Sequence, residues 1–196
     1  MHGAEIELKF PIADPAAFRR NVEALRFHLK TERTLEQNTL YDTPDRGLRA
    51  RGQIVRLRIY GSRCTLTHKR QPPGNDANSR YKTRIETESG VDDCAALAEI
   101  LTQLGFVPVF QYDKFRTEWS SSQSGGNLVV DETPIGVWAE LEGDPEWIDL
   151  MLERLEIPSA ECTTASYGRL FLDWKQRTRS PAENMTFAEA EVALSL

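Results

Sequence analysis

Residues 4–10 alternate charged and apolar side chains at every second position. Three charged residues share one parity and three apolar residues share the other: Glu5, Glu7 and Lys9 against Ile6, Leu8 and Phe10. Successive side chains of a β-strand point to opposite faces, so this segment predicts a strand with one ionic and one apolar face. One such strand is common at a protein surface, where one face of a sheet is often solvated.

The same alternation recurs in four later segments, with both signs of charge. The charged positions are Arg56 and Arg58; Arg84, Glu86 and Glu88; Lys114, Arg116 and Glu118; and Glu140 and Glu142. Five ionic faces favour a closed sheet with a polar interior. Isolated buried charges are costly, so the charges of such an interior would have to be paired or bound to a charged ligand. An ordinary helix-backed sheet with its charged face in bulk solvent is the alternative.

Period-two patterning predicts eight strands in one antiparallel sheet. They cover residues 4–10, 35–42, 53–60, 63–70, 80–89, 107–120, 127–131 and 137–142. The predicted fold class is therefore α+β, with an eight-stranded antiparallel barrel and amphipathic helices outside it. We expect one domain over residues 1–179, followed by an acidic tail or short helix over 180–196.

Four amphipathic helices interrupt the strands. Their predicted starts are Asp14-Pro15, Asp92 or Asp93, Asp144-Pro145, and Thr163 or Thr164. The first carries an apolar stripe that reaches Leu25 or Leu29, and the fourth carries Tyr167. We expect all these stripes to pack against the sheet rather than to bind a ligand.

Composition excludes several classes of function. The chain has 24 basic and 30 acidic residues and a net charge of −6, which disfavours binding to nucleic acid or to an anionic membrane. No apolar run reaches 18 residues, and charges occupy the N-terminal region where a signal peptide would be apolar. Cys64, Cys94 and Cys162 are widely spaced, which argues against a disulfide framework or a zinc site. We therefore expect a cytoplasmic protein; the sequence does not predict its oligomeric state.

Seven cations fall on the positions inferred to face inward. They are Lys9, Arg56, Arg58, Lys69, Arg84, Lys114 and Arg116. One phosphate needs two or three such groups, so seven suit an extended polyanion such as a triphosphate, with arginines bidentate on its oxygens.

Four carboxylates come from the first and last strands, which are neighbours if the barrel closes. They are Glu5, Glu7, Glu140 and Glu142. Grouped carboxylates raise one another's pKa values unless a cation lies among them, and hard oxygen ligands favour Mg²⁺ or Mn²⁺. A water activated by such a metal could then attack a terminal phosphoryl group without a histidine or cysteine nucleophile.

An ordered series of motifs resembles the CYTH superfamily, the triphosphate tunnel metalloenzymes. Glu5-Ile6-Glu7-Leu8-Lys9 looks like its ExExK signature. The other similar segments are Thr39 to Pro44, Val55 to Arg58, Leu66 to Lys69, Arg84 to Glu88, Lys114 to Arg116, Asp131 with Gly136, Glu140 and Glu142, and Ser166-Tyr167. The likeness covers about residues 4 to 172.

The resemblance implies an eight-stranded tunnel with the triphosphate in its bore. It implies metal ligation by Glu5, Glu7, Glu140 and Glu142, and catalytic roles for Glu5, Glu7, Lys9 and Glu88. Substrate binding would fall to Lys9, Arg56, Arg58, Lys69, Arg84, Lys114 and Arg116. Glu86 and Glu88 would orient cations, metal or water.

The predicted activity is metal-dependent hydrolysis of a triphosphate, with inorganic tripolyphosphate as the first choice because no base-reading pocket is evident. Three alternatives remain open: a class IV-type adenylyl cyclase acting on ATP, a thiamine triphosphatase, and a non-catalytic binder of polyphosphate or nucleotide.

A few further residues carry simpler predictions. His68 is out of phase with Lys69 and is expected outside the bore, and Tyr41 is expected to pack. Arg80 and Lys82 share the parity of Arg84 and would extend the basic wall. Asp131 either joins the acidic segment or caps the turn at Thr133. Residues 71–79 form a polar loop that could close a tunnel mouth.

Overall fold

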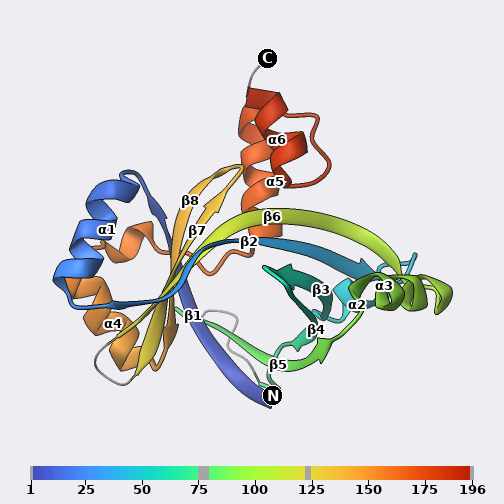
Figure 1. Ribbon diagram of the computed structural model, residues 1–196, viewed down its shortest axis with the longest axis horizontal. Helices are drawn as coiled ribbons and strands as arrows, with labels where there is room; N and C mark the ends of the chain where they lie inside the picture. Colours follow the sequence, from blue (N-terminus) through green and yellow to red (C-terminus); the bar gives the residue numbers. More distant parts are fainter. Residues whose placement is uncertain (1, 75–79, 122–124, 195–196) are drawn as a thin grey trace.

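Eight antiparallel strands close into a barrel, as the alternating pattern predicted (Figure 1). The computed structural model describes residues 2–74, 80–121 and 125–194. The strands are β1 (His2–Ile12), β2 (His28–Asp42), β3 (Ile54–Tyr60), β4 (Arg63–Arg70), β5 (Lys82–Val91), β6 (Val107–Ser120), β7 (Gly126–Thr133) and β8 (Gly136–Gly143). Their order around the barrel is β1-β5-β4-β3-β2-β6-β7-β8, and β8 pairs back with β1.

Helices cover the outside of this barrel. They are α1 (Pro15–Ala24), α2 (Gly47–Ala50), α3 (Cys94–Gln103), α4 (Pro145–Arg154), α5 (Tyr167–Thr178) and α6 (Phe187–Leu194), with a 3₁₀ turn at Ser159–Glu161. In Figure 1, α1 and α4 lie on the side of β1, β7 and β8, whereas α5 and α6 rise from one end. No helix in the described part of the chain is both long and apolar enough to cross a membrane.

The helices begin and end near the positions that the sequence predicted, with two corrections. Asp14 and Asp93 each accept a backbone N–H three residues on, at 2.9 Å, so Asp93 rather than Asp92 is the cap. The first helix ends at Ala24, because Arg26 takes a left-handed conformation (φ 59°); Leu29 therefore belongs to β2, which begins seven residues earlier than the predicted strand start at residue 35.

The second correction concerns the start of the last predicted helix. Thr163 pairs with Lys9 through two backbone hydrogen bonds of 2.7 and 3.1 Å, so it extends the sheet instead of capping a helix. The cap is Ser166, whose side chain accepts the Arg169 N–H at 3.3 Å, and α5 begins at Tyr167. This bridge fixes the start of α5 against β1, at the mouth of the barrel.

The apolar faces of the strands pack outward, beneath the helices. The largest cluster joins Leu8, Phe10 and Leu141 of the strands to Val22 of α1 and Ile148 of α4, and all five are almost fully buried. Burial of each such side chain stabilises the fold by about 1.5–3 kcal/mol. Because the core lies outside the sheet, the inner face is left to polar residues.

A disulfide joins Cys64 to Cys94, although the wide spacing of the cysteines argued against a disulfide framework. Cys64 is the second residue of β4 and Cys94 is the first of α3, and the fold brings their Cα atoms to 5.8 Å although they are 30 positions apart in sequence. Spacing alone could not reveal this pair, because the β4–β5 hairpin returns the chain to the start of β4. The bond ties α3 to the outer face of the barrel.

We expect Cys94→Ser to lower the free energy of unfolding by about 3–4 kcal/mol, because the cross-link no longer restricts the unfolded chain. Urea denaturation of the non-reduced protein would measure this loss. Cys162→Ser is the matched control, since Cys162 is a free thiol and its replacement should change little. Three titratable thiols in the denatured wild-type protein would contradict the cross-link.

Candidate functional site: the charged bore of the barrel

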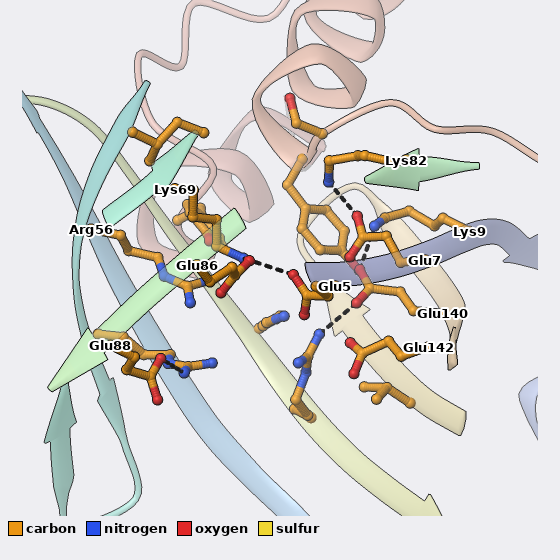
Figure 2. A pocket seen from close by; sticks show the side chains of 18 of the residues that line it. Glu5, Glu7, Lys9, Arg56, Lys69, Lys82, Glu86, Glu88, Glu140 and Glu142 are labelled. Atoms are coloured by element: carbon orange, nitrogen blue, oxygen red, sulfur yellow. Dashed lines mark hydrogen bonds and ion pairs between the residues drawn. The ribbon is translucent and has the colours of Figure 1, made fainter. Parts of the chain in front are cut away.

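The bore of the barrel contains a cavity of about 580 Å³ (Figure 2). All eight strands and the start of α5 contribute to its wall. The charged lining residues are Lys9, Lys30, Arg56, Arg58, Lys69, Lys82, Lys114 and Arg116, with Glu5, Glu7, Glu86, Glu88, Glu118, Glu140 and Glu142. The ionic strand faces therefore point inward, and the solvent-facing alternative is wrong.

Three of the carboxylates converge at one side of the cavity. The register pairs Glu7 with Glu142 across β1 and β8, and Glu5 lies two positions before Glu7 on the same face. Oxygens of Glu5, Glu7 and Glu142 lie within 4.8 Å of one another. Figure 2 shows these side chains pointing into the same part of the bore. We refer to them as the carboxylate trio.

The electrostatics of the trio suit a divalent cation. Burial, together with the negative charges of Glu5, Glu140 and Glu7, raises the pKa of Glu142 to about 8. Mg²⁺ and Mn²⁺ prefer carboxylate and other oxygen ligands such as these. Lys82 pairs with Glu7, and Lys69 reaches Glu5 at 3.2 Å, so two ammonium groups partly offset this charge. The residues therefore fit a metal ion.

Glu5 also forms a hydrogen bond with Glu86 of the neighbouring strand β5. Burial works to raise the pKa of Glu5, but the hydrogen bond from Glu86 and the charge of Lys69 lower it to about 2. Burial and the same hydrogen bond raise the pKa of Glu86 to about 7. Lys69 forms ion pairs with both carboxylates. A cation that enters the trio would thus compete with Glu86 as well as with Lys69 for Glu5.

Glu140 is a neighbour of the carboxylate trio but is not one of its three members. Its carboxylate pairs with Lys9 and accepts from Arg116 at 2.9 Å. These cations hold the pKa of Glu140 well below its usual range although burial acts in the opposite direction. Glu140 was predicted as a metal ligand together with the trio; in the structure its carboxylate pairs with two cations.

Lys114 and Arg116 form one wall with a buried acid behind them. Asp131 is fully buried and accepts from Lys114 at 2.9 Å and from both ends of the Arg116 guanidinium at 2.7 Å. The Tyr167 hydroxyl donates to the same carboxylate at 2.7 Å, and its ring faces the Lys9 ammonium at 4.4 Å. Asp131 thus belongs to the charged network of the bore. The turn after it is stabilised by Thr133, whose side chain bonds the backbone of Ile135 and Gly136.

Arg56 and Arg58 of β3, with Lys69 of β4, form a second wall, which β2 separates from the first. Arg58 donates to Glu88 at 2.7 Å, and Thr67 donates to the same Glu88 oxygen at 2.9 Å. Arg56 reaches Thr67 at 3.4 Å and forms no ion pair with a carboxylate in the described ranges. Of the three cations of this wall, Arg56 is therefore the one without an ion pair to a carboxylate in the described residues.

Most of the predicted substrate-binding residues meet in this cavity. Arg84 is the exception: its guanidinium donates to the carbonyl of Thr83 and does not line the cavity. Arg80 pairs with Asp149 on the outside, whereas Lys82 does line the bore. The predicted mouth loop at 71–79 lies partly outside the described residues.

Several residues that line or support the cavity were not predicted from the sequence. Tyr167 was expected only to pack, yet it lines the cavity and bonds Asp131. Glu36, Asn38 and Thr67 are buried on the inner faces of β2 and β4. The parity of Glu36 and Asn38 within 35–42 was a usable signal, but two polar residues beside Leu40 make a weak pattern. Tyr41 packs with Leu57, as expected.

The closed eight-stranded barrel with a charged bore is a tunnel fold. Residues 3–146 match the family model of the CYTH domain, and this match covers well over half of the chain. The chain therefore belongs to the CYTH domain family, as its motifs suggested. Members of this family are generally divalent-metal-dependent enzymes that act on triphosphates.

Solved structures repeat the fold at low sequence identity. An adenylate cyclase candidate from Vibrio parahaemolyticus is 18% identical, with a TM-score of 0.71 over 86% of this chain and 97% of that one. A protein from Pyrococcus horikoshii is 24% identical, with a TM-score of 0.66 over 86% and 98%. An adenylyl cyclase candidate from Hippeastrum, described as having a dominant triphosphatase activity, is 21% identical, with a TM-score of 0.63 over 88% and 96%. The comparison with curated protein sequences found no match.

We expect Mg²⁺ or Mn²⁺ alone to stabilise this protein against unfolding. A ligand that binds only the folded state at a hundredfold excess over its dissociation constant adds about 2.7 kcal/mol. Thermal melting with and without the metal measures the effect, and Glu142→Gln should remove most of it. Sodium chloride at equal ionic strength is the control; an equal shift from sodium would contradict a specific site.

Proposed function

We propose that this chain catalyses divalent-metal-dependent hydrolysis of a triphosphate, with inorganic tripolyphosphate and water yielding diphosphate and phosphate. The observation that carries the proposal is the convergence of two basic walls and the carboxylate trio in one closed bore. A bore of this kind suits a linear chain of several phosphates better than a single phosphate. Family membership supports the same class of reaction.

The two walls would hold the phosphate chain between them. Arg56 and Arg58 would bind it from one side, and Lys114 and Arg116 from the other. Guanidinium groups bind phosphate oxygens bidentately, which fixes the chain in register as well as in position. Substrate phosphates would replace the carboxylates that now pair with several of these cations, so binding exchanges one set of ion pairs for another.

Glu5, Glu7 and Glu142 would hold Mg²⁺ or Mn²⁺. When bound, the ion would supply charge neutralisation on the phosphate oxygens and a lower pKa for a water molecule. Lys9, fixed by Glu140, would stabilise negative charge that develops during phosphoryl transfer. Glu88 is engaged by Arg58 and Thr67, which supports an orienting role instead of the predicted catalytic one.

A second candidate is cyclisation of a nucleoside triphosphate. Leu40, Ile54 and Tyr112 contribute apolar surface to the same cavity, and this patch favours an organic group attached to the phosphate chain. The same surface would serve thiamine triphosphate. Cyclisation and hydrolysis would both use the two walls and the trio. They differ in which bond of the phosphate chain breaks.

Product analysis separates these activities. The purified protein would be incubated with tripolyphosphate, ATP or thiamine triphosphate, each with Mg²⁺, with Mn²⁺ and with excess EDTA. Release of phosphate and diphosphate from tripolyphosphate, fastest of the three and lost in EDTA, is the expected result. Cyclic AMP and diphosphate from ATP would establish the cyclase. Tight binding of tripolyphosphate without turnover of any substrate would establish a binding protein and refute the enzyme.

A further inference from the structure

Glu36 is a buried acid that stands behind the basic walls instead of facing the cavity. Its side chain is 0% exposed, and it is not among the residues that line the bore. In the sheet it lies directly opposite Lys114 of β6 and Tyr60 of β3. The Asn38 side chain donates to its Oε1 at 3.0 Å. A ligand in the cavity therefore reaches the cations before it could reach Glu36.

The carboxylate of Glu36 contacts cations from both walls. Its oxygens lie 3.3 Å from Lys114, 3.8 Å from Arg58 and 3.9 Å from Arg116. Among the ion pairs of the described ranges, only those of Glu36 join a cation of β3 to cations of β6. Asp131 forms ion pairs with Lys114 and Arg116 of β6, and Glu88 forms an ion pair with Arg58 of β3.

The charge state of Glu36 follows from these neighbours. Burial opposes ionisation, but Lys114, Arg116, Arg56 and Arg58 together hold the pKa of Glu36 far below its usual range. The group is thus a permanent anion and no proton carrier. Its Oε2 finds no hydrogen-bond donor in the described part of the chain, so that oxygen acts on the two guanidinium groups through charge at a distance.

We propose that Glu36 is a positioning residue, which sets the separation between Arg58 on one wall and Lys114 with Arg116 on the other. This inference rests on the proposed function, since the separation matters for a phosphate chain held between the walls. A shared counterion fixes both walls relative to one point. Preorganised charges of this kind stabilise a transition state because they need no rearrangement as the reaction proceeds.

Removing this charge has two effects of opposite sign. Glu36→Gln keeps the shape of the side chain but makes the bore more positive by one unit, which strengthens the general attraction for a polyanion. The same change frees Arg58 and Arg116 from their common anchor, which weakens stabilisation that depends on geometry. We therefore expect kcat for tripolyphosphate to fall at least about tenfold while KM stays unchanged or decreases.

A merely structural role would not give this split, because a loosened fold weakens binding as well as turnover. Glu132→Gln is the matched control: Glu132 follows Asp131 on β7, and its exposed side chain pairs with Arg33 outside the bore. It should leave kcat and KM as in the wild type. If Glu36→Gln does not fold, Asn38→Ala replaces it; this variant keeps the charge but loses the donor that orients it, and should lower kcat in the same direction by a smaller factor.

A second measurement keeps the inference separate from the proposed activity. ³¹P NMR of tripolyphosphate bound in EDTA requires no turnover. In the wild type the asymmetric bore should make the two terminal phosphates inequivalent, and in Glu36→Gln exchange between positions should average them. Absent turnover in the wild type would refute the proposed function alone, and the spectra would then decide the role of Glu36. Identical spectra, or a variant with wild-type kcat and KM, would overturn it.

Discussion

Glu7→Gln should reduce turnover of tripolyphosphate by at least about a hundredfold while the protein stays folded. Removal of one preorganised group at a reacting centre typically costs this much. Glu7 is central to the carboxylate trio, because it pairs with Glu142 across the β1–β8 junction and shares a strand with Glu5. An amide keeps the shape of the side chain and one oxygen, but it cannot supply the negative charge that would hold a divalent cation. Initial rates at saturating Mg²⁺, together with circular dichroism, measure both parts.

Two further variants identify the cause of the loss. Glu7 pairs with Lys82, so Glu7→Gln also frees that ammonium group. Lys82→Met removes the lysine and keeps the trio; it should affect KM more than kcat. Glu153→Gln, an exposed position on α4, controls for loss of a carboxylate in general. Wild-type turnover in Glu7→Gln would remove the trio from the mechanism, and a Lys82→Met variant as slow as Glu7→Gln would assign the loss to the freed lysine.

The inner face of the barrel could be predicted because parity is a strong signal when it repeats. Each of Glu5, Arg56 and Glu140 lies on a strand whose opposite parity is apolar, and a sheet with its core outside has only one place for the charges. The neighbourhood of β1 and β8 followed from closure alone. Neither step required any knowledge of distances.

The partners of each charge could not be predicted in the same way. Parity places Glu140 and Glu142 on one face, yet their partners differ. Glu140 forms ion pairs with Lys9 and Arg116, whereas Glu142 lies close to the carboxylates of Glu5 and Glu7. The register of β1 and β8 decides this, since it sets Lys9 opposite Glu140 and Glu7 opposite Glu142, and the alternation within each strand does not reveal that register. Arg84 illustrates the same limit, since it has the right parity but bonds its own strand.

The positions of residues from helices and hairpins relative to the bore could not be predicted either. Tyr167 reads as one more apolar position of an amphipathic helix, and only the Thr163–Lys9 bridge brings the start of α5 over the bore. The Cys64–Cys94 pair likewise depends on a long-range return of the chain. Such placements follow from tertiary contacts, which outweigh local patterns.

Asp131→Asn should lower the free energy of unfolding by about 3–5 kcal/mol, which is the usual cost of removing one partner from a buried ion pair. The carboxylate is fully buried and accepts from Lys114, from Arg116 at two nitrogens and from the Tyr167 hydroxyl. An amide oxygen accepts fewer of these bonds and leaves two buried cations undercompensated. For a domain of this size the loss corresponds to a drop in melting temperature of about 10 °C.

A polyanion should reverse part of this loss, which distinguishes uncompensated charge from damaged packing. Tripolyphosphate in EDTA would neutralise the freed cations and bind only the folded state, so Asp131→Asn should gain more stability from it than the wild type does. Leu128→Ala on the same strand is the comparison, since it removes a fully buried apolar side chain and should gain no more than the wild type. If Asp131→Asn melted like the wild type, Glu36 and Glu140 would suffice to hold both cations. If tripolyphosphate rescued both variants alike, the cost would lie in packing, and Asp131 would not be the acid that keeps this wall charged and in place.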